Sequence, residues 1–189
     1  MAARRARDSR LLDAVEALPV TRFDGSAWRI VRDGRDPLQA SAVGGRWDDR
    51  TFEVLYTSTT AEGAMAEMYF HLSRGQPVMP SRVQYRMFEL AVTLSDCVKI
   101  ATLGDLAALG VSIDVFGRLS YSDREREYPR TQDVGEAAHF HERAGMLVPS
   151  ARSDSANLVI ISEWAGPTSV SVVQDHGLID WGAWRRRGE

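Results

Sequence analysis

Short β-prone stretches and short helical patterns follow one another in irregular order along this chain of 189 residues, and this order constrains the fold most strongly. The β-prone stretches outnumber the helical ones, and neither an internal repeat nor a low-complexity block interrupts them. Proline and glycine are scattered, so no linker divides the chain. We therefore predict a mixed α+β protein with mainly antiparallel sheets and flanking helices.

Apolar periodicity and turn residues place the individual elements. The expected helices cover residues 9–18, 59–73, 102–109 and 131–144. The expected strands cover residues 28–31, 53–57, 83–87, 88–94 and 158–161, with others at 148 and 169–173. Thr59 and Glu62 have the spacing of a capping box, and Thr131 is expected to cap the last helix. A β-bulge near Met87 would reconcile the two strand phases on either side of it.

We expect one domain over residues 1–189, because a chain of this size can bury a single core. The helix at about 9–18 and a tail at about 175–189 are expected to be appendages of that domain. The most apolar stretch, Leu158 to Ile161, is too short to span a bilayer, and the basic opening leads into no apolar segment. The single cysteine, Cys97, cannot form an internal disulfide, which favours a cytoplasmic protein.

Several other classes of function receive little support. The 23 Lys and Arg residues against 26 Asp and Glu residues give a net charge of −3, so the arginine runs at 4–10 and 185–187 are expected to be solvated tails rather than nucleic-acid contacts. His139 and His141, two apart on a helix, point to different faces, so we expect no metal site. Ser58 and Ser150 lack the ordered His–Asp partners of a serine hydrolase.

The stretch from Trp28 to Glu67 holds the residues best suited to a dinucleotide site. They are Arg29, Gly44, Gly45, Arg46, Trp47, Tyr56, Ser58 and Glu67. Arginines and the N-terminal amides of the helix near Thr59 can hold a pyrophosphate, while aromatic faces can stack on a flat ring. Glu67 then remains for chemistry at a sugar carbon. The alternative stays open that Glu67 is a solvated helix residue and that Gly44–Gly45 is a plain turn.

Five segments of the chain occur together in an order that resembles a known family, the RES domain. They are GGRWDD at 44–49, VLYTS at 54–58, AMAE at 64–67, GMLVPSAR at 145–152 and NLVII at 157–161. The resemblance covers about residues 27–163. The family is named for an arginine, a glutamate and a serine, which match Arg29, Glu67 and Ser150 here.

The resemblance also implies a site for NAD+. With Arg29, Glu67 and Ser150, it places Tyr56 in the catalytic group. The residues implied to bind NAD+ are Arg29, Arg46, Trp47, Tyr56, Ser58 and Asn157. Two positions depart from the family pattern: Asp48 replaces a usual asparagine and Trp28 a common tyrosine, and either departure bears on the preference for an acceptor.

The function implied by the resemblance is that of a toxin in a bacterial type II toxin–antitoxin pair of the RES–Xre type, with a fold similar to mono-ADP-ribosyltransferase toxins. Such a protein cleaves the nicotinamide–ribose bond of NAD+ and passes ADP-ribose to phosphate, water or a target protein. Arg152 is a candidate to admit phosphate. The expected partner is a helix-turn-helix, Xre-like antitoxin. No metal or redox cofactor, membrane or nucleic acid is expected to take part.

The chemistry of this bond suggests a role for each residue. Because nicotinamide is a good leaving group, the transition state is oxocarbenium-like and needs an anion near the ribose, for which Glu67 is the candidate. Arg29 and Arg46 would hold the phosphates, Tyr56 would contact the nicotinamide–ribose end, and Ser150 would position the ligand or acceptor. A second hypothesis remains open: a catalytically inactive binding module that pairs with a repressor-type antitoxin.

Overall fold

The structure is a computed structural model that describes residues 7–73, 83–118 and 124–186. Its centre is a six-stranded sheet in the order β1-β2-β5-β4-β3-β6. The strands are β1 (Val20–Arg32), β2 (Val54–Ser58), β3 (Tyr85–Lys99), β4 (Gly145–Pro149), β5 (Ala156–Ile161) and β6 (Val170–Leu178). Within these residues the pairings are antiparallel except for that of β3 with β4. The predicted mixed α+β class with mainly antiparallel pairing is confirmed.

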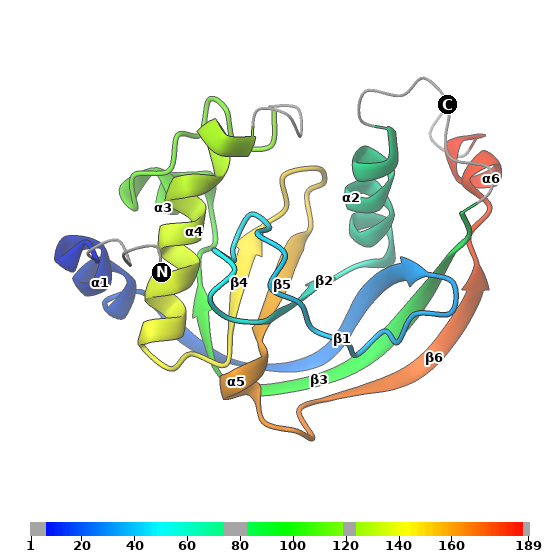
Figure 1. The fold of residues 1–189 in the computed structure, drawn as a ribbon, viewed down its shortest axis with the longest axis horizontal. Coiled ribbons are helices and arrows are strands. Elements are labelled where there is room, and N and C mark those ends of the chain that lie inside the picture. The colour runs from blue at the N-terminus through cyan, green and yellow to red at the C-terminus, as the bar shows by residue number, and fades with distance from the viewer. Residues whose placement is uncertain (1–6, 74–82, 119–123, 187–189) are drawn as a thin grey trace.

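A further pairing of β1 with β3 closes the strands β1, β2, β5, β4 and β3 into a circuit. The pairing of β1 with β2 is the shortest in this circuit, because it consists of one register pair, Trp28 with Ser58. Strand β6 lies outside the circuit along β3, and Figure 1 shows β1, β3 and β6 as long curved strands. The circuit therefore brings Arg29, the neighbour of Trp28, close to the end of β2.

Helices flank the sheet in two groups. They are α1 (Ser9–Glu16), α2 (Ala61–Ser73), α3 (Leu103–Ala108), α4 (Arg124–Phe140), α5 (Ser162–Ala165) and α6 (Trp181–Arg186). Figure 1 shows α1, α3 and α4 on one side of the molecule and α2 with α6 on the other. The ends of β4 and β5 lie between the two groups.

Strand β5 explains how the sheet is held between these layers. Its Val159 and Ile161 pack in the cluster that includes α1, α3 and α4, whereas Leu158 and Ile160 pack in the cluster that includes β1 and β3. All four side chains are at most 1% exposed, which accounts for the unbroken apolar run in the sequence. A third cluster joins α2 to β1 and to the tryptophans of α6.

Strand β1 and helix α4 differ from their predicted bounds. Strand β1 begins at Val20 rather than at 28, since its first half is largely exposed and is held by pairing with β3 rather than by apolar burial. Helix α4 begins at Arg124 and ends at Phe140, so Thr131 lies inside it, where its Oγ1 donates to the carbonyl of Tyr128. The bulge predicted near Met87 is confirmed as a register shift of β3 against β6.

The two segments expected to be appendages take part in the main packing. Leu11 and Val15 of α1 are buried in the first core cluster. Residues 175–178 continue β6 beside β3, and Trp181 and Trp184 pack in the cluster beneath α2. The sequence pattern predicted this strand only over 169–173 because β6 is mostly exposed and therefore shows no apolar alternation.

Close packing of α4 on the loop before β2 yields a stability prediction. A Cβ added at Gly135 of α4 would lie 2.0 Å from the carbonyl oxygen of Trp47, so Gly135→Ala must push the helix away from the loop. We expect the free energy of unfolding to fall by about 1–3 kcal/mol, measured by urea denaturation. Gly25→Ala is the control, because nothing lies within 4 Å of a Cβ there. Equal stability of the two variants would contradict the packing described.

Candidate functional site

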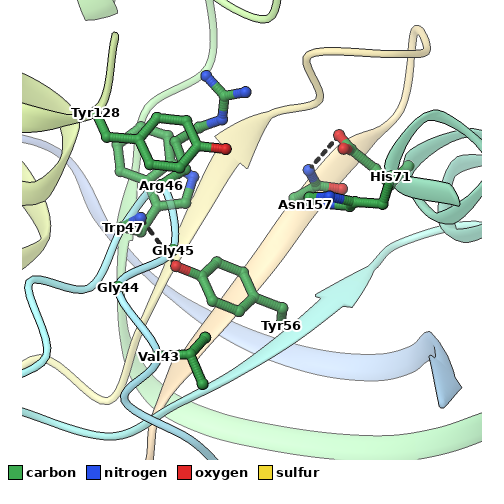
Figure 2. A pocket seen from close by; sticks show the side chains of 10 residues that line it. Val43, Gly44, Gly45, Arg46, Trp47, Tyr56, His71, Tyr128 and Asn157 are labelled. Carbon is green, nitrogen blue, oxygen red and sulfur yellow. Dashed lines mark hydrogen bonds between the residues drawn. The ribbon is translucent and has the colours of Figure 1, made fainter. Parts of the chain in front are cut away.

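A cleft lies between helix α2 and the loop before β2, and it consists of two connected cavities. The larger has a volume of about 500 Å³ and is lined by residues 43–47 with Tyr128, and the smaller, about 240 Å³, is lined by β1 and α2. Both cavities are lined by Tyr56, Glu67, His71 and Asn157, so these four residues stand at the junction. Figure 2 shows Arg46, Trp47 and Tyr128 on one side of the larger cavity and Asn157 with His71 on the other.

Glu67 is held at this junction by two hydrogen bonds. The hydroxyl of Ser150 donates to its Oε1 at 2.9 Å, and the amide Nδ2 of Asn157 donates to the same oxygen at 3.0 Å. The Ser150 hydroxyl in turn accepts from the backbone N–H of Arg152 at 3.1 Å. A carboxylate fixed in this way presents one oriented negative charge to the cleft, so the reading of Glu67 as a solvated helix residue is not supported.

Asn157 carries a buried acceptor in the same place. Its Nδ2 bonds Glu67, while its Oδ1 is buried and has no hydrogen-bond partner among the described residues. Asn157 lies on β5 opposite Ser58 of β2, which fixes its backbone at the centre of the sheet. An unpaired buried acceptor is costly, so a ligand donor that reaches it would gain from the contact.

Arg29 supplies a half-buried cation in the smaller cavity. Its Nη2 donates to the carbonyl of Gln39 at 2.9 Å, whereas its Nη1 is buried and unpartnered among the described residues. Burial lowers the pKa of Arg29 to about 10, an effect that the charge of Asp36 opposes. The guanidinium therefore keeps its charge at neutral pH and has a free donor for an anion.

The glycine pair in the loop is already bound by an anion of the chain itself. The N–H of Gly44 donates to Asp48 Oδ1 and that of Gly45 to Asp48 Oδ2, each at 2.7 Å. Gly44 has a φ of +80°, which favours glycine, and a Cβ at Gly45 would lie 2.5 Å from the hydroxyl of Tyr56. The turn is thus a closed structural unit, and its amides are not free to cradle a phosphate.

Tyr56 is tied to the same unit. Its hydroxyl donates to Asp48 Oδ2 at 3.0 Å and accepts from the backbone N–H of Trp47 at 2.9 Å. Burial, followed by the charge of Asp48, raises the pKa of Tyr56 well above its ordinary value. Tyr56 is therefore a neutral phenol at physiological pH, and its ring faces the cleft (Figure 2).

Arg46 lies in the larger cavity with its charge paired. Its Nη1 forms a salt bridge with Glu127, a side chain that also accepts from the backbone N–H of Gly117 at 2.7 Å. The guanidinium lies 4.7 Å from the ring centre of Phe116 and 5.2 Å from that of Tyr128. Arg46 thus differs from Arg29, because a carboxylate of the chain already neutralises it.

Two other predicted binding residues are largely enclosed. Trp47 is 2% exposed and packs in the first core cluster, with its ring centre 6.5 Å from that of Phe116. Ser58 is also 2% exposed, and its Oγ lies 3.4 Å from the hydroxyl of Ser155. Both residues border the cleft, Trp47 at the larger cavity and Ser58 at the smaller one.

The start of α2 differs by one residue from the predicted capping box. Thr60, not Thr59, bonds the helix, because its Oγ1 accepts from the N–H of Gly63 at 3.0 Å. Thr59 instead bonds the backbone of Ala156. A Cβ at Gly63 would lie 2.3 Å from the hydroxyls of both Ser58 and Ser155, so this glycine lets α2 approach the sheet closely and brings Glu67 into reach.

His71 and Tyr128 are among the residues lining the cleft that sequence reasoning missed. His71 lies four positions after Glu67, one helical turn further along the same face of α2, and this spacing was a usable signal. Tyr128 lies on α4 and is 6% exposed, but nothing in its local sequence connects it with a site formed by residues 43–71.

The remaining candidates lie elsewhere. His139 contacts Glu163 at 2.7 Å, while His141 contacts the carbonyl of Leu12, and among the described residues no group of three or more His, Cys, Asp or Glu side chains could hold a metal. Burial raises the pKa of the Cys97 thiol to about 12, which makes it a poor nucleophile. Arg4, Arg5 and Arg187 lie outside the described residues. No helix in the described ranges is long and apolar enough to cross a membrane.

The fold and the cleft define a mixed α+β protein whose helix α2 brings a hydrogen-bonded carboxylate into a two-part cleft beside a half-buried arginine. A chain in the crystal structure of the M. tuberculosis MbcT–MbcA toxin–antitoxin complex has a similar fold, with a TM-score of 0.78 and 21% identity over 96% of this chain and 98% of that one. No curated protein matches the chain. The RES domain model matches residues 26–182, and the chain belongs to this family.

Proposed function

We propose that this protein is a toxin of a toxin–antitoxin pair that cleaves the nicotinamide–ribose bond of NAD+. The observation that carries the proposal is the Glu67 carboxylate, fixed by Ser150 and Asn157 at the junction of the two cavities. Membership of the RES family adds support, as these are the residues that the family resemblance assigns. The cytoplasm, where NAD+ is available, is the proposed compartment.

The proposed reaction breaks the bond between C1′ of the ribose and the pyridinium nitrogen, and the bonding electron pair leaves with nicotinamide. The ribose then carries oxocarbenium character, which a nearby carboxylate stabilises. Among the described residues, Glu67 is the Asp or Glu side chain that lines both cavities. Since Ser150 and Asn157 already orient one carboxylate oxygen, little reorganisation is needed as the positive charge develops.

Binding of the substrate draws on two buried atoms of the site that have no hydrogen-bond partner among the described residues. The buried Nη1 of Arg29 suits a phosphate oxygen, and the buried Oδ1 of Asn157 suits a hydroxyl or amide donor of the ligand. Tyr56 offers its ring to the nicotinamide–ribose end. Arg46 adds to the wall of the larger cavity, although its salt bridge with Glu127 makes Arg29 the stronger phosphate anchor.

The acceptor of ADP-ribose remains open among phosphate, water and a protein nucleophile, each of which loses a proton as the new C1′ bond forms. Arg152, a candidate for admitting phosphate, lies with its guanidinium 3.2 Å from the ring centre of Phe70 on α2. Its backbone N–H bonds Ser150, so the segment after Ser150 is close to the reacting group. The product identifies the acceptor: free ADP-ribose indicates water, ADP-ribose phosphate indicates phosphate, and a labelled protein indicates a protein nucleophile.

Substitution of the carboxylate tests the proposal directly. Glu67→Gln is nearly isosteric and still accepts from Ser150 and Asn157, but it removes the charge. We expect nicotinamide release from NAD+, followed by liquid chromatography, to fall about 10²–10³-fold in kcat. Glu62→Gln, on the exposed face of the same helix, is the matched control and should keep full activity. Full turnover by folded Glu67→Gln would refute the assignment, and no cleavage by the unmodified protein would leave the binding-module alternative.

Substitution of Arg29 separates the effect of its charge from that of its donor geometry. Arg29→Lys keeps the positive charge but loses the planar fork of donors, so we expect the affinity for NAD+ to weaken about tenfold. Calorimetry in the Glu67→Gln background measures binding without turnover. Arg32→Lys, three residues along β1 and exposed, should bind like the parent. An unchanged dissociation constant for Arg29→Lys would show that Arg29 does not hold the substrate.

The toxin part of the proposal predicts a growth phenotype. Induced expression of the full chain in bacteria should arrest growth and deplete NAD+ or label a protein, whereas expression of Glu67→Gln should do neither. Co-expression of a co-encoded helix-turn-helix protein should restore growth and co-purify with the chain. Harmless expression of soluble protein that is active in vitro would count against a toxin role.

A further inference from the structure

The buried carboxylate of Asp48 contacts residues that line the cleft but does not line the cleft itself. It is fully buried and accepts hydrogen bonds from the N–H groups of Gly44 and Gly45 and from the hydroxyl of Tyr56. We propose that Asp48 is a positioning residue, whose negative charge fixes Tyr56 and the turn at 43–47 as the wall opposite Glu67. The inference rests on the proposed function and deepens it.

In this chain the hydrogen-bond directions suit a carboxylate at position 48, where the family pattern usually has an asparagine. Each of the three groups around Asp48 approaches with a donated hydrogen, Gly44 to Oδ1 and both Gly45 and Tyr56 to Oδ2. The Tyr56 oxygen already accepts from Trp47, so its own proton points toward Asp48. An asparagine in either orientation would turn its NH2 group toward at least one backbone N–H, since an amide has only one acceptor oxygen.

The residues that Asp48 holds, the turn at 43–47 and Tyr56, form the cavity wall itself. All five residues from Val43 to Trp47 line the larger cavity, and Tyr56 lines both cavities together with Glu67. Asp48 lines neither of them, so it acts on a ligand only through its neighbours. A small shift of the wall changes how the substrate lies against Glu67, and misplacement of about 1 Å can cost about 10²-fold in rate.

A substitution at Gly45 tests the contact between Asp48 and Tyr56 independently. A Cβ there would lie 2.5 Å from the Tyr56 hydroxyl and 2.8 Å from Asp48 Oδ2, so Gly45→Ala must displace one of them. If Asp48 acts through Tyr56 and the turn, Gly45→Ala and Asp48→Asn should have non-additive effects on catalysis. Two independent structural defects would instead add.

The first experiment measures, without any ligand, how firmly the turn at 43–47 is held. Hydrogen exchange of the Gly44 and Gly45 amides, followed by NMR on the full chain, should accelerate at least about tenfold in Asp48→Asn because a carboxylate acceptor is lost. Asp49→Asn is the matched control, since Asp49 accepts hydrogen bonds from Thr51 in its own turn and from no other described residue. Unchanged exchange at both glycines in Asp48→Asn would overturn the proposal.

The second experiment measures kcat and KM for NAD+ in folded Asp48→Asn. We expect kcat to fall about 10–100-fold, whereas a merely structural role would lower stability and leave kcat of the folded protein unchanged. Accelerated exchange with unchanged kcat therefore also overturns the proposal, and so does additivity with Gly45→Ala. If Asp48→Asn fails to fold, Gly45→Ala and Tyr56→Phe provide the kinetic test: unchanged kcat in both would overturn the positioning role.

Failure of this inference can be told from failure of the proposed function. If the unmodified protein does not cleave NAD+, the proposed function fails, and with it the catalytic meaning of the wall. The exchange measurement still decides whether Asp48 holds the turn. If the unmodified protein cleaves NAD+ and Asp48→Asn does so equally well, only the positioning role of Asp48 is lost.

Discussion

The hydrogen bonds that Ser150 and Asn157 donate to Glu67 join three parts of the chain that are far apart in sequence. They connect helix α2 with the segment after β4 and with β5, so the carboxylate is oriented only when the sheet is complete. Close approach of α2 depends on Gly63, where any side chain would collide with Ser58 and Ser155. The site is therefore a product of the whole fold rather than of one motif.

The opposite wall of the cleft, the turn at 43–47 with Tyr56, is held by different contacts. There Asp48 satisfies two backbone N–H groups and a phenol within ten residues of itself, and α4 packs against the loop through Gly135. Local polar contacts hold the turn at 43–47, contacts with α4 cover it, and only long-range contacts orient Glu67 among the described residues. Arg29 lines the smaller cavity with a buried donor that no described residue satisfies, as a site for an anionic ligand requires.

Much of this arrangement was predictable from sequence. Elements with clear apolar periodicity, such as α1 and β5, were placed within a few residues of their bounds, and the family resemblance brought Arg29, Glu67 and Ser150 together. The exposed half of β1 and most of β6 were missed because pairing rather than burial holds them. The salt bridge of Arg46 with Glu127 joins residues 81 positions apart, and no local pattern reveals such a pairing.

NAD+ cleavage in this cleft requires that Glu67 meets the nicotinamide ribose at the junction of the two cavities. A crystal structure of the Glu67→Gln protein with NAD+ tests it most directly, because the dinucleotide should bind without being cleaved. We expect the C1′ atom to lie beside the substituted side chain, with a phosphate oxygen on Nη1 of Arg29. NAD+ bound outside the cleft, or with its nicotinamide ribose away from position 67, would contradict the account.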